Sequence, residues 1–242
     1  MNKLEEIFYS NQGPMIGKWK HYFEIYDRHL SRYIDKEVNV LEIGVDHGGS
    51  LNMWRDYFGK HANIYGVDIN PKCKELEGDR IKVFIGNQED TEFLGHIIMQ
   101  IPKLDILIDD GGHMMKQQIT TFELLFNHID NNGIYICEDL HTSYWNKFGG
   151  GYKNKKSFAE YSKNFIDYIN AWHSKTRRLQ VSEFTRTVHG LHYYDSMLVI
   201  EKRAIKEPEL LQSGMFTTEA PKKISLLRHP RQWIVNKISR SR

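Results

Sequence analysis

The chain has 242 residues, 40% of them hydrophobic, which is long enough for one large α/β domain or two small ones. Its 33 basic and 31 acidic residues leave a net charge of only +2, too weak a field to favour nucleic acid as a partner. The first residues lack the apolar stretch of a signal peptide, and no apolar run approaches the ~18 residues that a transmembrane helix needs. These features predict a cytoplasmic protein.

Apolar periodicity predicts the secondary structure in chain order. An aromatic stripe at three- and four-residue steps predicts an amphipathic helix over about 17–34. Short strands then alternate with helical faces, the strands at 38–43, 63–69, 81–85, 104–108 and 134–137, and the helical faces near 51–58, 93–98, 119–129 and 158–172. Two long strands, Leu179 to Thr187 and Leu191 to Lys202, are expected to form a hairpin around Gly190.

The repeated strand–helix alternation predicts an α/β fold. We expect a seven-stranded, Rossmann-like sheet that is mostly parallel, with a C-terminal antiparallel hairpin and helices on both faces. The predicted organisation is an N-terminal helical cap at 1–37, one cofactor-binding domain at 38–204 and a basic tail at 205–242.

Two acidic clusters follow two of these strands. Asp109 and Asp110 come directly after the strand at 104–108, and Glu138 and Asp139 follow the next strand, 28 residues after Asp110. Ligands collect at the carboxyl ends of parallel strands, so these acids should converge on one crevice. Carboxylates that converge need a cation or a proton to offset their repulsion. Three carboxylates drawn from these two clusters would suit a hard cation such as Mg²⁺ better than zinc.

A glycine loop follows the first strand, with Gly44, Gly48 and Gly49 ahead of a helix, and Asp68 ends the second strand. Such a loop lets the backbone approach a ligand closely, and such an acid can hold ribose hydroxyls. Both features fit a dinucleotide as well as S-adenosylmethionine. The absence of a G-x-G-x-x-G spacing, an acid (Glu42) ahead of the first glycine, and the terminal hairpin favour S-adenosylmethionine.

These segments resemble a known family. Val40-Leu41-Glu42-Ile43-Gly44, Gly66-Val67-Asp68-Ile69 and Ile106 to Asp110 are similar to the ordered motifs of class I S-adenosylmethionine-dependent methyltransferases. More narrowly, Leu107 to His113 and Tyr135 to Trp145 resemble the metal-dependent O-methyltransferases of macrolide sugars and the related group called cephalosporin hydroxylase. The resemblance covers roughly residues 17–202.

The resemblance implies an enzyme that transfers a methyl group from S-adenosylmethionine to a hydroxyl of a sugar or glycosylated metabolite, with Mg²⁺ or another hard divalent cation. It implies three metal ligands, Asp110, Glu138 and Asp139, and His113 as the catalytic base. It assigns Asp68 to the ribose, Asn87 and Gln88 to the neighbourhood of the adenine, and a further cofactor contact to Asp109. The methionine end would be lined by Glu42, Gly44 and Ser50.

Two other functions stay open from the residues. An NAD-dependent oxidoreductase would share the glycine loop and Asp68, and Tyr152 and Lys156 have the Tyr-x-x-x-Lys spacing of some such enzymes. A non-catalytic scaffold with a methyltransferase fold is the other alternative. The tail at 221–242 carries seven Lys or Arg and no acid, a composition that predicts weak contact with an anionic membrane surface. We also expect a homo-oligomer.

Overall fold

The computed structural model describes residues 1–215. The chain divides into two compact units, Met1–Glu207 and Pro208–Arg242, and the first contains every helix and strand described below. The membrane contact predicted for 221–242 lies outside the described residues. None of the helices within residues 1–215 combines the length and the apolar character needed to span a bilayer.

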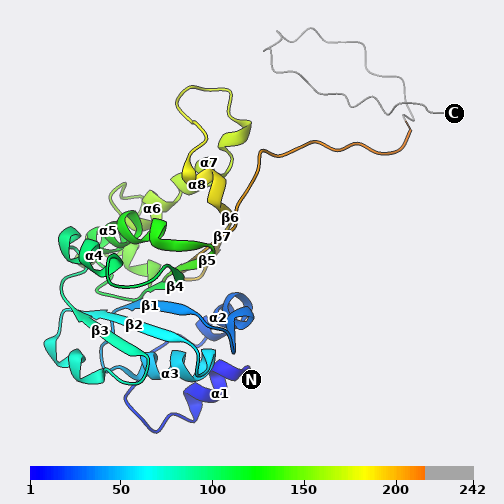
Figure 1. Cartoon of the computed structure of the whole chain (residues 1–242). Helices are drawn as coiled ribbons and strands as arrows, with labels where there is room; N and C mark the ends of the chain where they lie inside the picture. Colours follow the sequence, from blue (N-terminus) through cyan, green and yellow to red (C-terminus); the bar gives the residue numbers. More distant parts are fainter. Residues whose placement is uncertain (216–242) are drawn as a thin grey trace. The chain divides into compact units, whose positions relative to one another are not determined.

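A seven-stranded sheet forms the centre of the first unit (Figure 1). Across the sheet the strands run β3 (Ile81–Ile85), β2 (Asn63–Asp68), β1 (Asn39–Ile43), β4 (Leu104–Asp109), β5 (Ile129–Cys137), β7 (Met197–Lys202) and β6 (Val188–Tyr194). The first five pair in parallel, whereas β7 is antiparallel to both β5 and β6. The predicted fold class is confirmed. The strand order reverses between β1 and β4, where open α/β sheets bind ligands.

Helices cover both faces of the sheet. On one face α1 (Lys3–Tyr9), α2 (Tyr22–Leu30) and α3 (Gly49–Phe58) pack on strand residues such as Val40 and Ile106. On the other face α4 (Thr91–Ile98), α5 (Met115–Leu125), α6 (Phe158–Ser162) and α7 (Asn164–Ile169) pack on Leu41 and Leu107. The side chains of successive strand residues therefore point to opposite faces of the sheet, as the two-residue repeat of a strand requires. Short 3₁₀ turns occupy Ser31–Tyr33, Pro71–Leu76, Phe126–His128, Leu140–Tyr144, Asn146–Phe148 and Ala171–His173.

The terminal hairpin differs from its prediction. Residues predicted as a strand from Leu179 to Thr187 instead end in helix α8 (Glu183–Thr187), and the hairpin is formed by β6 and β7. The helix forms because the Ser182 side chain accepts the backbone N–H of Thr185 at its N-terminus, while the Thr185 hydroxyl accepts the N–H of Ser182. Gly190 lies inside β6 beside a register shift rather than in the turn, a common place for glycine in a strand.

Three other predicted elements also differ in their extent. The helix predicted over 17–34 begins only at Tyr22, so Lys18 and Trp19 lie in the connecting segment before α2. The strand predicted after Gly133 begins at Ile129, with an irregular register opposite β4 before the regular pairing resumes at Ile134. The helical face predicted over 158–172 is divided into α6 and α7 at Lys163.

Candidate active site

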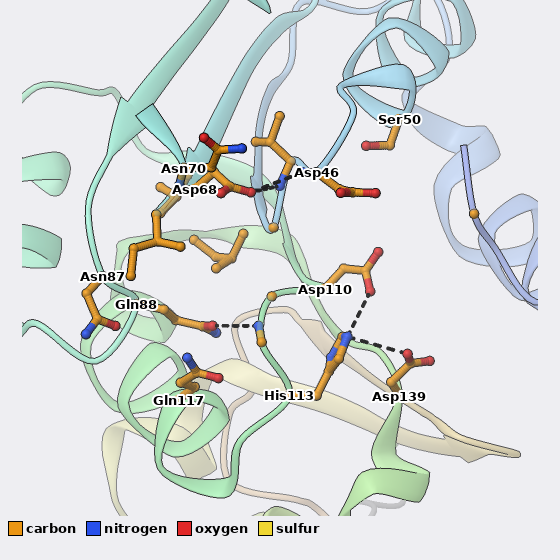
Figure 2. A pocket seen from close by; sticks show the side chains of 18 of the residues that line it. Asp46, Ser50, Asp68, Asn70, Asn87, Gln88, Asp110, His113, Gln117 and Asp139 are labelled. Atoms are coloured by element: carbon orange, nitrogen blue, oxygen red, sulfur yellow. Dashed lines mark hydrogen bonds and ion pairs between the residues drawn. The ribbon is translucent and has the colours of Figure 1, made fainter. Parts of the chain in front are cut away.

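A cavity of about 560 Å³ opens at the carboxyl ends of β1, β2, β3 and β4 (Figure 2). Sequence reasoning had singled out eight of the residues that line it: Gly44, Ser50, Asp68, Asn87, Gln88, Asp110, His113 and Asp139. It had not singled out Asp46, Asn70 and Gln117, which also line the cavity. The first two of these follow strand ends in the same way as the predicted acids, and that position is the signal that could have found them.

The glycine loop after β1 has a shape that requires glycine. Gly44 has a φ of 89°, and a Cβ at this position would overlap the carbonyl oxygen of Asp110. Asp68 at the end of β2 fixes the same loop, because one of its oxygens accepts the backbone N–H groups of Val45 at 2.9 Å and Asp46 at 3.1 Å. The loop and the two strand ends are therefore held as one rigid wall of the cavity.

Glu42 lies beneath this loop and does not line the cavity. Its carboxylate is fully buried and accepts the hydroxyl of Ser50 at 2.6 Å and the indole N–H of Trp54 at 3.0 Å. Burial raises the pKa of Glu42, although the ammonium of Lys18 and the two hydrogen bonds oppose this shift. In this structure Glu42 orients Ser50, and its predicted contact with the cofactor stays a prediction.

Gln88 ties the end of β4 to α5. Its amide N–H₂ donates to Asp109 at 2.6 Å and to Thr121 at 2.9 Å, and its oxygen accepts the backbone N–H of Gly112 at 3.3 Å. Asp109 is fully buried, does not line the cavity, and burial raises its pKa to about 7. Asn87 is exposed at the rim. Gln88 thus supports the loop that carries Asp110, in addition to lining the cavity.

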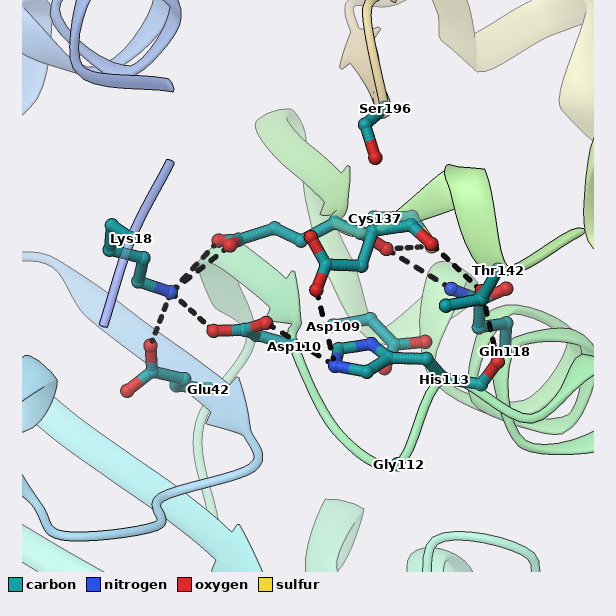
Figure 3. Close-up of polar contacts among 12 residues, drawn as sticks. Lys18, Glu42, Asp109, Asp110, Gly112, His113, Gln118, Cys137, Thr142 and Ser196 are labelled. Atoms are coloured by element: carbon teal, nitrogen blue, oxygen red, sulfur yellow. Dashed lines mark hydrogen bonds and ion pairs between the residues drawn. The ribbon is translucent and has the colours of Figure 1, made fainter. Parts of the chain in front are cut away.

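The acids at the ends of β4 and β5 converge, as the sequence predicted. Asp110 and Glu138 both contact the ammonium of Lys18, and Figure 3 shows the contact between Lys18 and Asp110. Asp110 and Asp139 both approach Nε2 of His113. Tyrosines of α2 fix the two β5 acids: Tyr26 donates its hydroxyl to Glu138, and Tyr22 donates to Asp139 at 2.9 Å. Burial raises the pKa of Glu138 well above its usual value, and the neighbouring Asp110 adds to the shift.

His113 lies between the two acidic clusters. Its Nε2 is 3.5 Å from Asp139 and 3.9 Å from Asp110, while its buried Nδ1 has no hydrogen-bond partner among the described residues. His113 and Asp139 both have left-handed backbones, with φ of 55° and 54°. A non-glycine residue rarely adopts this conformation, and such strain is concentrated at functional sites.

Lys18 is a further lining residue that sequence reasoning missed. Its side chain is 2% exposed, and its ammonium lies 3.1 Å from both carboxylate oxygens of Glu138, in contact with Asp110, and 3.5 Å from Glu42. Burial alone would lower the pKa of Lys18, but the charges of Asp110, Glu138 and Glu42 outweigh it and the pKa is raised. A lysine in a connecting segment gives no local signal for such a contact.

Comparison with known proteins identifies relatives of this chain. The chain is 34% identical over 192 residues to the 8-demethyl-8-alpha-L-rhamnosyl tetracenomycin-C 2'-O-methyltransferase of Streptomyces olivaceus, covering 76% of the chain and 50% of that protein. It is 36% identical over 217 residues to the demethylmacrocin O-methyltransferase of Streptomyces fradiae, covering 82% and 53%. The chain is a homologue of the sugar O-methyltransferases.

A solved structure of a sugar O-methyltransferase is also similar to this chain in fold. The MycE methyltransferase of the mycinamycin biosynthetic pathway, in complex with Mg, SAH and mycinamycin VI, superimposes with a TM-score of 0.74 at 32% identity, covering 84% of the chain and 53% of MycE. The chain therefore spans about half the length of the sugar O-methyltransferases that it matches. No protein-family model matches the chain.

The donor set of this sugar O-methyltransferase homologue fits a hard divalent cation. Asp110, His113 and Asp139 each offer a ligand atom within 4.8 Å of the others, and Glu138 contributes a further carboxylate next to Asp110. Mg²⁺ prefers carboxylate oxygens. The positive charge of Lys18 lies among these acids and offsets part of their mutual repulsion.

Proposed function

We propose that the chain is an S-adenosylmethionine-dependent, Mg²⁺-dependent O-methyltransferase that acts on a hydroxyl of a sugar or glycosylated metabolite. One observation carries the proposal: Asp110, Asp139 and His113 form a cluster on the wall of the cavity that the glycine loop encloses. A methyl donor bound on the loop and a hydroxyl bound at the acids would therefore meet at His113. The relatives are named as sugar O-methyltransferases, and MycE was crystallised with Mg and SAH.

The loop side of the cavity suits the methyl donor. Asp68 presents a carboxylate at the end of β2, where hydrogen bonds to ribose hydroxyls are made in related sheets. Its oxygens already accept three backbone N–H groups, those of Val45, Asp46 and Asn70, so the carboxylate is held in place before the donor binds. A rigid carboxylate loses little conformational freedom on binding.

The part of the site that carries the acids after β4 and β5 suits the acceptor. Asp110, Glu138 and Asp139 would hold Mg²⁺, which when bound supplies a Lewis acid and a template for two neighbouring oxygens of the acceptor. Tyr22 and Tyr26 keep two of these acids fixed through their hydroxyl groups. A sugar hydroxyl is a poor nucleophile because its pKa is far above 7. Fixed metal ligands would hold this hydroxyl in contact with the methyl group, which favours attack.

His113 is the proposed general base. Its Nε2 faces the cluster, so the nitrogen can accept the proton of the acceptor hydroxyl, while Asp139 at 3.5 Å would stabilise the resulting imidazolium. The acceptor oxygen then forms a bond to the methyl carbon as the carbon–sulfur bond of the sulfonium breaks. The products are a methyl ether, S-adenosylhomocysteine and a proton on His113.

An exposed aromatic rim supports a glycoside as the acceptor. Trp19 lines a second cavity, of about 250 Å³, together with Asp110, Glu138 and Asp139. The ring of His141 lies 5.9 Å from that of Trp19 and 4.6 Å from that of Trp145, and both tryptophans are about half exposed. Exposed apolar rings beside a polar site are typical of ligand-binding surfaces, and the C–H face of a pyranose would pack on them.

The test is methyl transfer from labelled S-adenosylmethionine to a panel of rhamnosides and macrolide glycosides. Activity should disappear in EDTA and return with Mg²⁺, while calorimetry detects donor binding in both conditions. Asp68→Ala should weaken donor binding by roughly 1.5–3 kcal/mol through loss of a charge-assisted bond. Full transfer after exhaustive chelation, or a donor affinity unchanged in Asp68→Ala, would contradict the proposal.

No observation on the described residues favours the oxidoreductase alternative, since neither Tyr152 nor Lys156 lines the cavity. Calorimetry with NAD in place of the methyl donor tests it directly. A homo-oligomer and membrane-surface contact through 221–242 stay predictions from the sequence.

A further inference from the structure

Lys18 contacts two of the acids that a metal ion would need. Its ammonium lies 3.1 Å from both oxygens of Glu138 and contacts Asp110, and these are two of the three proposed metal ligands. The side chain is 2% exposed, so water does not screen these contacts. The ammonium also lies 3.5 Å from Glu42, which is not a proposed ligand. Lys18 therefore neutralises the acids in the absence of any metal.

An ammonium and a magnesium ion cannot share these oxygens. Mg²⁺ binds oxygen at about 2.0–2.1 Å and demands near-octahedral geometry, so it would have to enter the space between Asp110 and Glu138 that the ammonium fills. Two positive charges at such separations also repel strongly in a buried site. Metal binding therefore requires Lys18 to move away from at least one of the two carboxylates.

The segment that carries Lys18 also forms a wall of both cavities. Met15, Ile16, Gly17 and Lys18 line the larger cavity, and Gly17, Lys18 and Trp19 line the smaller one. Its start lies close against α3, since a Cβ on Gly49 would overlap the carbonyl oxygens of Pro14 and Met15. Movement of Lys18 would thus be transmitted to residues that face the donor and the acceptor.

We propose that Lys18 is a built-in counter-ion that competes with the divalent cation for Asp110 and Glu138, so that metal loading displaces Lys18 and shifts the 15–19 wall of the site. This inference rests on the proposed metal site and adds a residue that sets its affinity. A competitor that occupies the site lowers the apparent affinity in proportion to the fraction of sites left open.

The test measures Mg²⁺ and Mn²⁺ binding by calorimetry in the absence of methyl donor and acceptor. Lys18→Met should bind Mg²⁺ at least about tenfold more tightly than the parent chain, because the competing charge is gone. Lys18→Arg should remain close to the parent, and Lys20→Met, an exposed lysine two residues away, is the matched control. Equal or weaker metal binding by Lys18→Met would overturn the inference.

A second readout uses the unaltered chain, in case Lys18→Met does not fold with its acids unpaired. Acylation by an amine-reactive reagent, followed by mass spectrometry, should leave Lys18 protected without metal and labelled at saturating Mg²⁺, while Lys20 is labelled equally in both. Protection of Lys18 that is unchanged by Mg²⁺ would overturn the inference. Because neither readout involves methyl transfer, both stand even if no acceptor is ever methylated.

Discussion

The hydroxyl of Thr142 lies 3.1 Å from the carbonyl oxygen of His113 and is buried with the rest of its side chain. The same hydroxyl lies 2.8 Å from the carbonyl oxygen of Asp139. His113 and Asp139 both have left-handed backbones, so Thr142 joins two strained turns, one carrying the proposed base and the other a proposed metal ligand.

Thr142→Val should therefore lower turnover while leaving donor binding intact. Loss of the hydroxyl removes its hydrogen bond to the carbonyl of His113, which costs about 0.5–1.5 kcal/mol of stability. A misplaced base costs up to about 10²-fold in rate, so we expect turnover to fall by roughly 10- to 100-fold. Thr142→Ser keeps the hydroxyl and should stay near the parent rate. A valine variant with parental turnover would show that the turns hold without this bond.

Gly44→Ala should disturb the donor loop and the metal site together. The left-handed backbone alone costs a non-glycine residue about 1–3 kcal/mol, and the added Cβ would push on the carbonyl of Asp110. We expect a lower free energy of unfolding and weaker binding of both S-adenosylmethionine and Mg²⁺, measured by denaturation and calorimetry.

Gly95→Ala is the matched control for Gly44→Ala. Gly95 lies within α4 and has no atom within 4 Å of an added Cβ, so alanine there should be neutral or stabilise by up to about 1 kcal/mol. If both alanine variants behave alike, the close approach of Gly44 to Asp110 is not what constrains the loop.

His113→Ala should lower the turnover number by about 10²–10⁴, the usual contribution of a general base. Donor affinity should stay the same, because the donor lies on the loop side of the cavity. His141→Ala, which removes the neighbouring imidazole of the aromatic rim, should act mainly on the acceptor KM. Should the pH profile and rate of His113→Ala match the parent, the base is elsewhere and His141 is the next candidate.

A buried histidine near the C-terminal end of α2, His29, should make the fold sensitive to acid. His29 bonds Glu201 and the hydroxyl of Tyr194, each at 2.8 Å, and burial lowers its pKa from 6.5. Below pH 6.5 the unfolded chain therefore binds a proton that the folded chain does not, and stability falls as the pH drops from 6.5 toward the folded pKa.

Replacing His29 by Gln should reduce this slope. The free energy of unfolding of the parent, measured by urea denaturation between pH 7.5 and 5, should decrease more steeply with falling pH than that of His29→Gln. His47→Gln is the control, because His47 is exposed on the glycine loop and makes no buried contact. Parallel pH profiles for parent and His29→Gln would refute the assignment.

The sequence by itself determined the sheet and the positions of its ligand-bearing ends. Strand–helix alternation, the glycine loop and the acids after β4 and β5 are local patterns, and parallel strands bring their carboxyl ends to one edge whatever the rest of the chain does. The same local logic failed at 179–187, where the interlocking side chains of Ser182 and Thr185 favour a helix over the strand suggested by composition.

Only the tertiary structure decided what neutralises the acids. Lys18 is 92 residues from Asp110 and 120 from Glu138 along the chain, and it meets them because α2 packs across the ends of β4 and β5 and brings its preceding segment with it. Tyr22 and Tyr26 reach Asp139 and Glu138 for the same reason. Periodicity could show that α2 is buried, but which of its polar atoms face the carboxylates depends on how helix and sheet are docked.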